Sequence, residues 1–342
     1  MSNNKTILVT GVSGYLGSHV VDQLVEAGYR VRGAARSGKI PFVKEACKIY
    51  GDRFEAVAID DLIAGDFTEA LKGVDAVIHV AAPLVEGGLN ILRQGEKAGI
   101  SKFVIVSSIA AVRSAYASFE EETGWTDVDW NPVTKEEALK SPDSFYVYSA
   151  AKTLAERAVW DFVDEHPHID VTTVNPPFFF GPFAPCYTIP DATLKALKTN
   201  YNAAKLSAFS TNYVIYDLLR PDGVLMFPFA WSIDVRDVAR GLVSALASRT
   251  DVGRKRILMT AEWYSWKDAA EWISAAHPEL KGRLSKAARS AGPAPTTKID
   301  NARAREVLGL VPRPSKQTLL DAVDQYIALE KKWASKGYNL QE

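Results

Sequence analysis

The first half of the chain alternates short apolar runs with longer amphipathic stretches. Runs such as TILVT, DAVIH and KFVIV predict strands buried on both faces, whereas GSHVVDQLVEAG has the apolar spacing of a helix. Strands that alternate with helices in this way build βαβ units around a parallel sheet. The pattern therefore predicts an α/β fold with a doubly wound parallel sheet.

The pattern changes after residue 176. PPFFFGPFAPCYTIP is dense in proline and aromatic residues, which predicts a loop packed near a pocket. The remaining sequence mixes helical pieces with short apolar runs such as RILMTA and predicts a smaller, mostly helical lobe. We expect a main domain over residues 1–176, with roughly 226–248 returning to it. The smaller lobe would then comprise 177–225 and 249–342.

Composition excludes several classes of partner. The 342 residues are 47% hydrophobic, and 40 basic side chains nearly cancel 41 acidic ones. Without a basic stripe, nucleic acid is not an expected partner. No apolar run reaches the roughly 18 residues of a membrane span, so we expect a soluble, cytoplasmic protein. Two isolated cysteines, Cys47 and Cys186, predict neither a disulfide nor a metal site.

Three glycines lie between the first predicted strand and helix, in the stretch TGVSGYLG. Gly11 permits a tight turn, Gly14 lets the backbone approach a pyrophosphate, and Gly17 allows close helix packing. The spacing predicts a Rossmann-type dinucleotide site in which free amides at the helix start face the anion. Contacts with the cofactor are also expected at Ser13, Tyr15 and Leu16.

The second predicted strand ends in VRGAARSGK, which carries Arg36 and Lys39 and no carboxylate. Dinucleotide sites for NAD place an acidic residue here, whereas sites for NADP place arginine near the 2′-phosphate. The two cations favour NADP(H), and ordinary solvated surface charge is the alternative.

Two further strand ends supply expected cofactor contacts. Asp61 and Leu62, after the third strand, are placed to meet the adenine. Ala81 and Ala82, after the fourth, would let the backbone lie close to the cofactor. Either pair could instead be ordinary residues at the end of a strand.

A tyrosine and a lysine share one face of a predicted helix in SFYVYSAAK. Tyr148 and Lys152 are four residues apart, so the phenol and the ammonium stand over one another. A positive charge beside a weak acid is in outline a device for proton transfer. The spacing alone also arises by chance on solvated helices.

The motifs TGVSGYLG, DAVIHVAAP, FVIVSS and YSAAK together resemble the extended short-chain dehydrogenase/reductase family. VRGAARS, WDFVDE, VNPPFFFGP and SIDVRDVARG are similar to its branch of plant dihydroflavonol 4-reductases and fungal aldehyde, ketone and methylglyoxal reductases. The resemblance runs from Thr6 to about Ile327. It implies an NADP-dependent oxidoreductase.

The resemblance also implies a catalytic triad of Ser108, Tyr148 and Lys152. Tyr148 would protonate the alkoxide that hydride transfer leaves, and Ser108 would orient the carbonyl. Lys152 would lower the pKa of the tyrosine and hold the nicotinamide ribose. Ser107 is a rival for Ser108, because adjacent strand residues point to opposite faces and only one can serve.

The same resemblance places the substrate pocket after the fourth and sixth strands. Its expected apolar and aromatic lining favours a hydrophobic or aromatic aldehyde or ketone, and besides the triad it comprises Pro83, Leu84, Pro177, Phe178, Tyr187 and Trp231. Pro176 and Phe179 are expected to contact the cofactor. Ordinary core packing is the alternative for these residues.

One departure from the family concerns the segment after Pro83. Relatives have a substantial loop there, whereas HVAAPLVEGGLNIL joins strand and helix almost directly. The short connection could admit bulkier substrates, weaken closure over the cofactor, or reflect a missing natural segment.

The leading functional hypothesis is an NADPH-dependent carbonyl reductase, monomeric or homodimeric, acting on a small molecule. Two alternatives share the fold. One is a nucleotide-sugar epimerase or dehydratase that retains its NAD(P), and the other is a non-catalytic NADP-sensing protein. Arg36 and Lys39 argue against retained NAD, and the complete triad argues against a sensor.

Overall fold

The computed structural model describes residues 4–81, 85–113, 124–225, 229–294 and 299–340. The chain divides into two compact units, each made of several segments. The first comprises Met1–Pro177, Val238–Met259 and Thr297–Val311. The second comprises Phe178–Asp237, Thr260–Thr296 and Pro312–Glu342.

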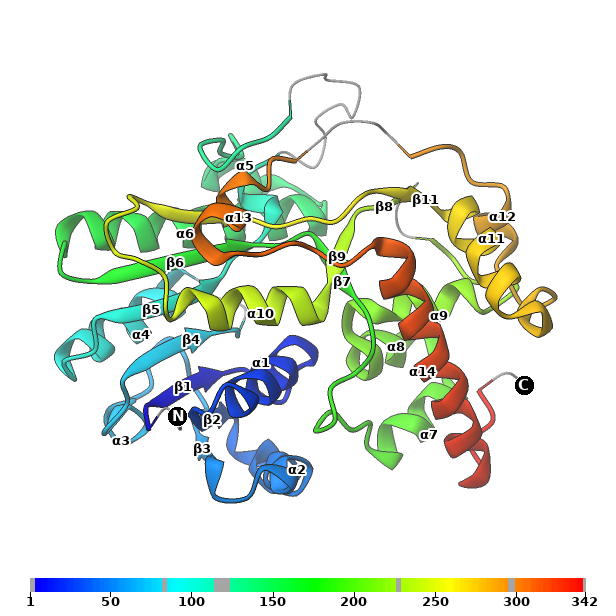
Figure 1. Ribbon diagram of the computed structural model, residues 1–342, viewed down its shortest axis with the longest axis horizontal. Coiled ribbons are helices and arrows are strands. Elements are labelled where there is room, and N and C mark those ends of the chain that lie inside the picture. The colour runs from blue at the N-terminus through cyan, green and yellow to red at the C-terminus, as the bar shows by residue number, and fades with distance from the viewer. Residues whose placement is uncertain (1–3, 82–84, 114–123, 226–228, 295–298, 341–342) are drawn as a thin grey trace. The chain divides into compact units, whose positions relative to one another are not determined.

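The first unit is built on a parallel sheet, which has seven strands within the described residues (Figure 1). In spatial order the strands are β10 (Lys255–Leu258), β6 (Asp170–Asn175), β5 (Lys102–Val106), β4 (Ala76–His79), β1 (Thr6–Thr10), β2 (Arg30–Ala35) and β3 (Phe54–Ala58). The chain order reverses between β1 and β4, where a doubly wound sheet opens its ligand crevice. The predicted α/β, Rossmann-type fold is confirmed.

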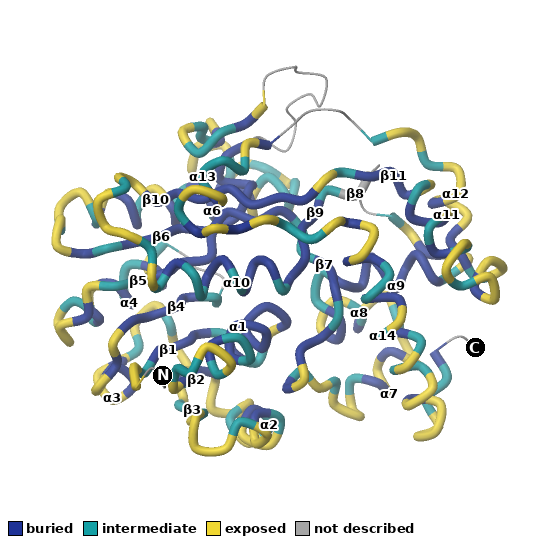
Figure 2. Tube along the Cα trace, in the orientation of Figure 1, coloured by how far each residue is buried: buried dark blue, intermediate teal, exposed yellow. Residues whose placement is uncertain are grey.

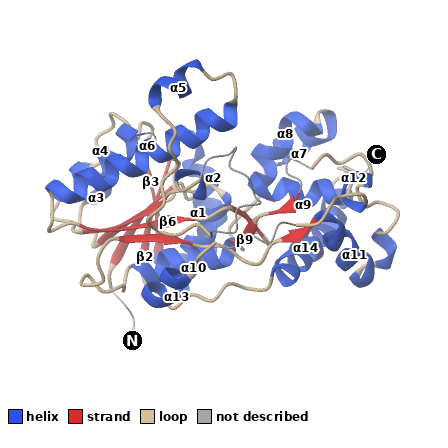
Figure 3. Cartoon of the chain, turned by 90° about the horizontal axis from the view of Figure 1, so that it is seen from above, coloured by secondary structure: helices blue, strands red, loops and turns tan. Residues whose placement is uncertain are grey.

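Helices cover both faces of this sheet. The helices that accompany the sheet are α1 (Tyr15–Glu26), α2 (Ile40–Ala46), α3 (Thr68–Leu71), α4 (Val85–Lys97), α6 (Ser144–Glu165), α10 (Val235–Ala245) and α13 (Ala302–Leu308), and α5 (Lys135–Lys140) packs against α6. Figure 3 shows α4 and α6 on one side of the strands and α10 and α13 on the other.

Burial explains why the central strands have continuous apolar sequences. All four residues of β4 and four of the five in β1 and β5 are buried, because helices cover both faces (Figure 2). Phe103, Phe67 and Trp160 belong to the core on the side of α3, α4 and α6. The edge strand β3 is only partly buried.

The second unit is mostly helical. Its helices are α7 (Asp191–Thr199), α8 (Tyr201–Phe209), α9 (Tyr213–Leu218), α11 (Trp266–Ala276), α12 (Lys286–Arg289) and α14 (Ser315–Ser335). Two short strand pairs accompany them: β7 (Phe178–Phe180) with β9 (Ser232–Asp234), and β8 (Phe229–Ala230) with β11 (Tyr264–Ser265). Among the described helices, none combines the length and the apolar character needed to cross a membrane.

Three segments differ from the sequence prediction. RILMTA, assigned above to the smaller lobe, contains β10, which pairs with β6 in the main sheet. Residues 226–237, expected to return to the main domain, belong to the second unit, and the return begins at Val238. The proline-rich stretch contains the strand β7, because its three consecutive phenylalanines pair with β9 before Gly181 ends the strand. The assignment of separate functions to the two parts of the chain stays a prediction.

Candidate active site

The turn after β1 and the first turn of α1 each contain a glycine that has no room for a side chain. Gly11 has φ +76°, and a Cβ there would lie 2.9 Å from the amide nitrogen of Ala81. A Cβ on Gly17 would lie 2.2 Å from the carbonyl oxygen of Gly11. Helix α1 follows Gly14 with no side-chain cap and no acidic residue in its first turn within the described chain. This positive helix end suits an anion, and the cradle fits a dinucleotide pyrophosphate.

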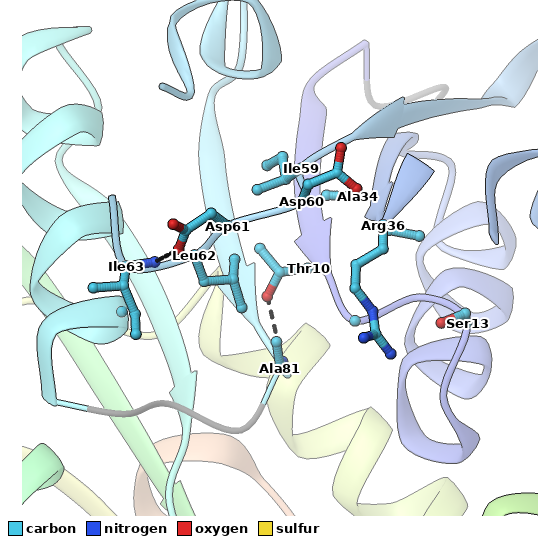
Figure 4. Close-up of a pocket in the computed structure, with 13 residues that line it drawn as sticks. Thr10, Ser13, Ala34, Arg36, Ile59, Asp60, Asp61, Leu62, Ile63 and Ala81 are labelled. Atoms are coloured by element: carbon cyan, nitrogen blue, oxygen red, sulfur yellow. Dashed lines mark hydrogen bonds between the residues drawn. The ribbon is translucent and has the colours of Figure 1, made fainter. Parts of the chain in front are cut away.

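A cavity of about 340 Å³ opens beside this loop (Figure 4). It lies at the carboxyl ends of β1 to β4, and its lining comprises Thr10, Gly11, Ser13, Ala34, Ala35, Arg36, Ile59, Asp60, Asp61, Leu62, Ile63, Ala81 and Gly87. Of the predicted cofactor residues, those that line it are Gly11, Ser13, Arg36, Asp61, Leu62 and Ala81.

The other described residues that were predicted to contact the cofactor do not line this cavity. Gly14, Tyr15, Leu16 and Gly17 form the helix start, and Lys39 lies in the exposed 3₁₀ turn Ser37–Lys39 that follows Arg36. Pro176 follows β6 in the first unit, and Phe179 lies in β7 of the second. Ala82 lies outside the described residues, as do Pro83 and Leu84.

A buried histidine of β4 is hydrogen-bonded to the last residue of β1. The Nδ1 atom of His79 lies 2.9 Å from the Thr10 hydroxyl, which also accepts a 3.3 Å hydrogen bond from the amide of Ala81. Burial, with the charge of Lys152 as a smaller cause, lowers the pKa of His79 to about 4. His79 is therefore neutral at pH 7.

Asn90 on α4 holds the loop that follows β3. Its amide nitrogen donates to the carbonyl oxygens of Leu62, at 3.2 Å, and Gly65, at 3.1 Å. Gln94, one turn further along, donates to the same Gly65 carbonyl at 2.8 Å. These bonds fix the cavity wall that contains Asp61 and Leu62.

The two serines at the end of β5 have different partners. Ser107 donates a 2.6 Å hydrogen bond to the buried carboxylate of Glu156. Ser108 lies beside the Tyr148 side chain, close enough to influence the pKa of its hydroxyl, and the Ser108 oxygen accepts a hydrogen bond from the amide of Ala110 at 3.2 Å. The structure thus brings Ser108, and not Ser107, together with the tyrosine.

Helix α6 carries both Tyr148 and Lys152. Asp143 caps the helix by accepting hydrogen bonds from the amides of Phe145 and Tyr146, so the helix begins one turn before Tyr148. Tyr148 leaves 44% of its surface exposed, whereas Lys152 leaves only 7%. No carboxylate in the described part of the chain lies within ion-pair distance of the Lys152 ammonium.

The predicted downward shift of the Tyr148 pKa is wrong for this structure. Burial around the hydroxyl raises the pKa of Tyr148, and the neighbouring Ser108 hydroxyl opposes that shift. Burial also lowers the pKa of Lys152 to about 8, while the charge of Glu156 acts in the opposite direction. The sequence reasoning counted the attraction between the two groups but not the cost of desolvating them.

Glu156, one turn beyond Lys152, ties α6 to the sheet. Its carboxylate accepts from Ser107, from Thr173 at 3.0 Å and from Asn175 at 2.6 Å. It also accepts a 2.8 Å hydrogen bond from the buried guanidinium of Arg256 on β10. This satisfied carboxylate fixes the helix that presents Tyr148 and Lys152.

The described substrate-pocket candidates are divided between the units. Ser108, Tyr148 and Pro177 belong to the first. Phe178, Tyr187 and Trp231 belong to the second, where the Tyr187 ring stacks on Phe183 with centroids 4.8 Å apart. The Tyr187 hydroxyl donates to the Ala208 carbonyl at 2.9 Å, so its polar end is used in local packing. Their role in substrate binding stays a prediction.

Sequence reasoning missed two polar residues of the cavity wall, Thr10 and Asp60. Both occupy positions at the carboxyl end of a strand, which is the signal that could have found them. Thr10 is the last residue of β1, and Asp60 follows β3 directly before the predicted Asp61.

The doubly wound sheet, the glycine cradle and the serine–tyrosine pair define the class of protein, a dinucleotide-dependent enzyme. Residues 7–259 match the model described as the NAD dependent epimerase/dehydratase family. The chain belongs to this family, and the resemblance to the extended short-chain dehydrogenases/reductases is confirmed.

Two relatives match this chain over nearly their whole length. The putative NADPH-dependent methylglyoxal reductase GRP2 of Candida albicans is 31% identical, over 96% of this chain and 100% of that protein. Ketoreductase azaE of Aspergillus niger is 30% identical, over 93% and 96%. The crystal structure of Gre2 from Candida albicans is similar with a TM-score of 0.77 and 25% identity, over 95% and 99%. The chain is an oxidoreductase.

Proposed function

We propose that this oxidoreductase is an NADPH-dependent carbonyl reductase that converts a hydrophobic or aromatic aldehyde or ketone to an alcohol. The observation that carries the proposal is the proximity of the Ser108 hydroxyl to the Tyr148 side chain, which lies on the helix that also carries the buried Lys152. The names of the relatives, a methylglyoxal reductase and a ketoreductase, support carbonyl substrates.

The coenzyme is NADP(H). The cavity wall includes Arg36, and in the described part of the chain its guanidinium forms no ion pair. A guanidinium at the end of the second strand is the group that accommodates a 2′-phosphate. Ser13 and the start of α1 after Gly14 would hold the pyrophosphate.

Tyr148 acts as the proton donor in this proposal. A bound reduced nicotinamide would supply the hydride for the carbonyl carbon, and the carbonyl oxygen would become strongly basic. Because its pKa is raised, the Tyr148 phenol stays protonated at neutral pH and can give its proton to that oxygen. Ser108 donates to the same oxygen and orients it. Lys152, one turn further along α6, would supply positive charge for the phenolate left behind.

The choice of a hydrophobic substrate is supported by the second unit. Phe178, Phe179 and Trp231 are only half-buried there, so apolar surface remains to meet a ligand. A nucleotide sugar, in contrast, carries its own diphosphate in addition to that of the coenzyme, and it would require further cationic side chains.

The test replaces one hydroxyl at a time on the same helix. Tyr148→Phe should lower carbonyl reduction by about 10²–10⁴-fold, because the proton donor is lost. Its dissociation constant for NADPH should stay within about twofold of wild type. Tyr146→Phe is the matched control, because the Tyr146 hydroxyl donates to the exposed Glu137 at 2.9 Å. It should retain wild-type turnover.

The assay follows NADPH oxidation and alcohol formation over a panel of aromatic ketones, diketones and aldehydes. One NADPH consumed for each alcohol formed supports the reductase. Interconversion of a nucleotide sugar without net consumption of NADPH would favour the epimerase, and tight NADPH binding without turnover would favour the sensor. Normal turnover by Tyr148→Phe would show that another group is the acid.

A further inference from the structure

Asp60 occupies the hydrogen-bond donors of the turn that follows Arg36. Its carboxylate accepts from the backbone amide of Ser37 at 2.7 Å and from the Ser37 hydroxyl at 2.5 Å. Asp60 and Arg36 both line the cavity, from the ends of β3 and β2 (Figure 4). These two hydrogen bonds hold the turn in place.

The same donors would suit a phosphate. A 2′-phosphate near Arg36 gains from a guanidinium and from amide and hydroxyl donors on the adjoining turn. Here the Ser37 amide and hydroxyl are already satisfied by an anionic acceptor. Asp60 also brings a negative charge that opposes the positive charge of Arg36, whose field lowers the pKa of Asp60 after the larger effect of the Ser37 bonds.

We propose that Asp60 is a residue that determines coenzyme specificity, because it competes with the 2′-phosphate for Ser37 and repels it. This inference rests on the proposed function, in which Arg36 binds that phosphate. The chain then binds NADPH with a smaller advantage over NADH than Arg36 and Lys39 alone would provide. The negative charge of Asp60 thus limits the preference for NADPH over NADH that Arg36 and Lys39 favour.

Asp60→Asn is the discriminating variant, because it removes the charge and keeps an oxygen that can accept from Ser37. Its matched control is Asp66→Asn. Asp66 likewise accepts from the amide and hydroxyl of one residue, Thr68, at 2.9 and 2.6 Å, but it does not line the cavity. A change shared by both variants would therefore reflect the loss of a local turn and not coenzyme selection.

The probes are two adenosine fragments without nicotinamide, 2′,5′-ADP and 5′-ADP, titrated calorimetrically into the full chain. Asp60→Asn should bind 2′,5′-ADP about five- to tenfold more tightly than wild type, the effect of removing a unit charge within roughly 6 Å. Binding of 5′-ADP should change less than about twofold, and the gain should shrink at high salt. Asp66→Asn should leave both affinities unchanged.

Three outcomes would overturn the inference. Weaker binding of both fragments by Asp60→Asn would make Asp60 a purely structural support of the turn. Selective loss of 5′-ADP binding would make it a ligand of the ribose hydroxyls. Failure of every variant to bind either fragment would also overturn it. In contrast, the predicted gain in a chain that reduces no carbonyl would support the Asp60 inference and defeat the proposed reaction.

Discussion

The Ser107 hydroxyl donates to the Glu156 carboxylate across 2.6 Å, inside the first unit. This bond assigns the two adjacent serines to different tasks, because Ser108 is left to meet Tyr148. It also links the end of β5 to the helix that carries the tyrosine and lysine. A residue that the sequence presented as a rival of Ser108 is part of its support.

Exchange of each serine for alanine should separate these tasks. Ser108→Ala should lower turnover about 10²-fold or more, because the carbonyl oxygen loses a hydrogen-bond donor. Ser107→Ala should keep turnover within several-fold and lower the free energy of unfolding by about 1–3 kcal/mol, because a buried carboxylate loses a partner. Steady-state kinetics and urea unfolding of both variants measure the contrast. The reverse pattern would identify Ser107 as the residue that orients the substrate.

The ion pair between Glu156 and Arg256 should contribute to the stability of the fold. Its two side chains are 1% and 2% exposed, and Arg256 also donates to the carbonyl oxygens of Ala111 and Asp127. Arg256→Met should lower the free energy of unfolding by about 3–5 kcal/mol, because it leaves a buried carboxylate without its counter-ion. Urea unfolding at pH 7 measures the loss.

Arg249→Met is the control for this change. Arg249 pairs with Asp251, but their side chains are 75% and 62% exposed. Removal of such a pair should change the urea midpoint far less than Arg256→Met. Equal effects would show that the buried pair has no special role.

The coenzyme preference predicts a selective loss at Arg36. Arg36→Ala should weaken NADPH binding about ten- to a hundredfold, because a charge-assisted hydrogen bond to phosphate is removed. NADH binding should change by less than about twofold. Fluorescence titration with both coenzymes measures the two constants. Arg53→Ala is the control, since the Arg53 guanidinium donates to the Val25 carbonyl at 3.2 Å and does not line the cavity. Equal losses of affinity for the two coenzymes would show that Arg36 does not bind the 2′-phosphate.

The sheet could be predicted because its signal is local. Strands buried on both faces need continuous apolar sequence, and a parallel order needs helices between them. Gly11 and Gly17 could be recognised because backbone contacts exclude a Cβ at both positions, so glycine is required there and shows in the sequence at a fixed spacing. The apolar run of β10 was recognised but assigned to the smaller lobe, because the strand is four residues long and returns to the sheet from a segment of different character.

The contacts in the cavity wall and the pKa of Tyr148 depend on residues that are distant in the sequence. Asp60 meets Ser37, 23 positions earlier, only because β2 and β3 pair in one register. The pKa of Tyr148 rises because folding buries the hydroxyl, which the spacing to Lys152 does not reveal. Sequence reasoning therefore found residue types and strand ends, but not their hydrogen-bond partners.

His79 predicts how stability should depend on pH. Burial lowers its pKa from 6.5 to about 4 on folding, so the unfolded chain binds a proton more readily. The free energy of unfolding is therefore unaffected by this histidine above pH 6.5, and it decreases as the pH falls from 6.5 toward 4. Between pH 7 and pH 5 this decrease amounts to about 2 kcal/mol. Urea unfolding at the two pH values should show that this part of the loss is absent in His79→Gln.

The control is His168→Gln, which makes the same change at a histidine whose side chain is 64% exposed. Carboxylates that titrate below pH 5 act on all three proteins alike, so the difference between variants isolates the imidazole. A steeper loss in His79→Gln than in wild type would mean that the glutamine disrupts the bond to Thr10 in a way that depends on pH. An unchanged slope would mean that the His79 imidazole takes up its proton inside the folded protein, contrary to the effect expected from its complete burial between β1 and β4.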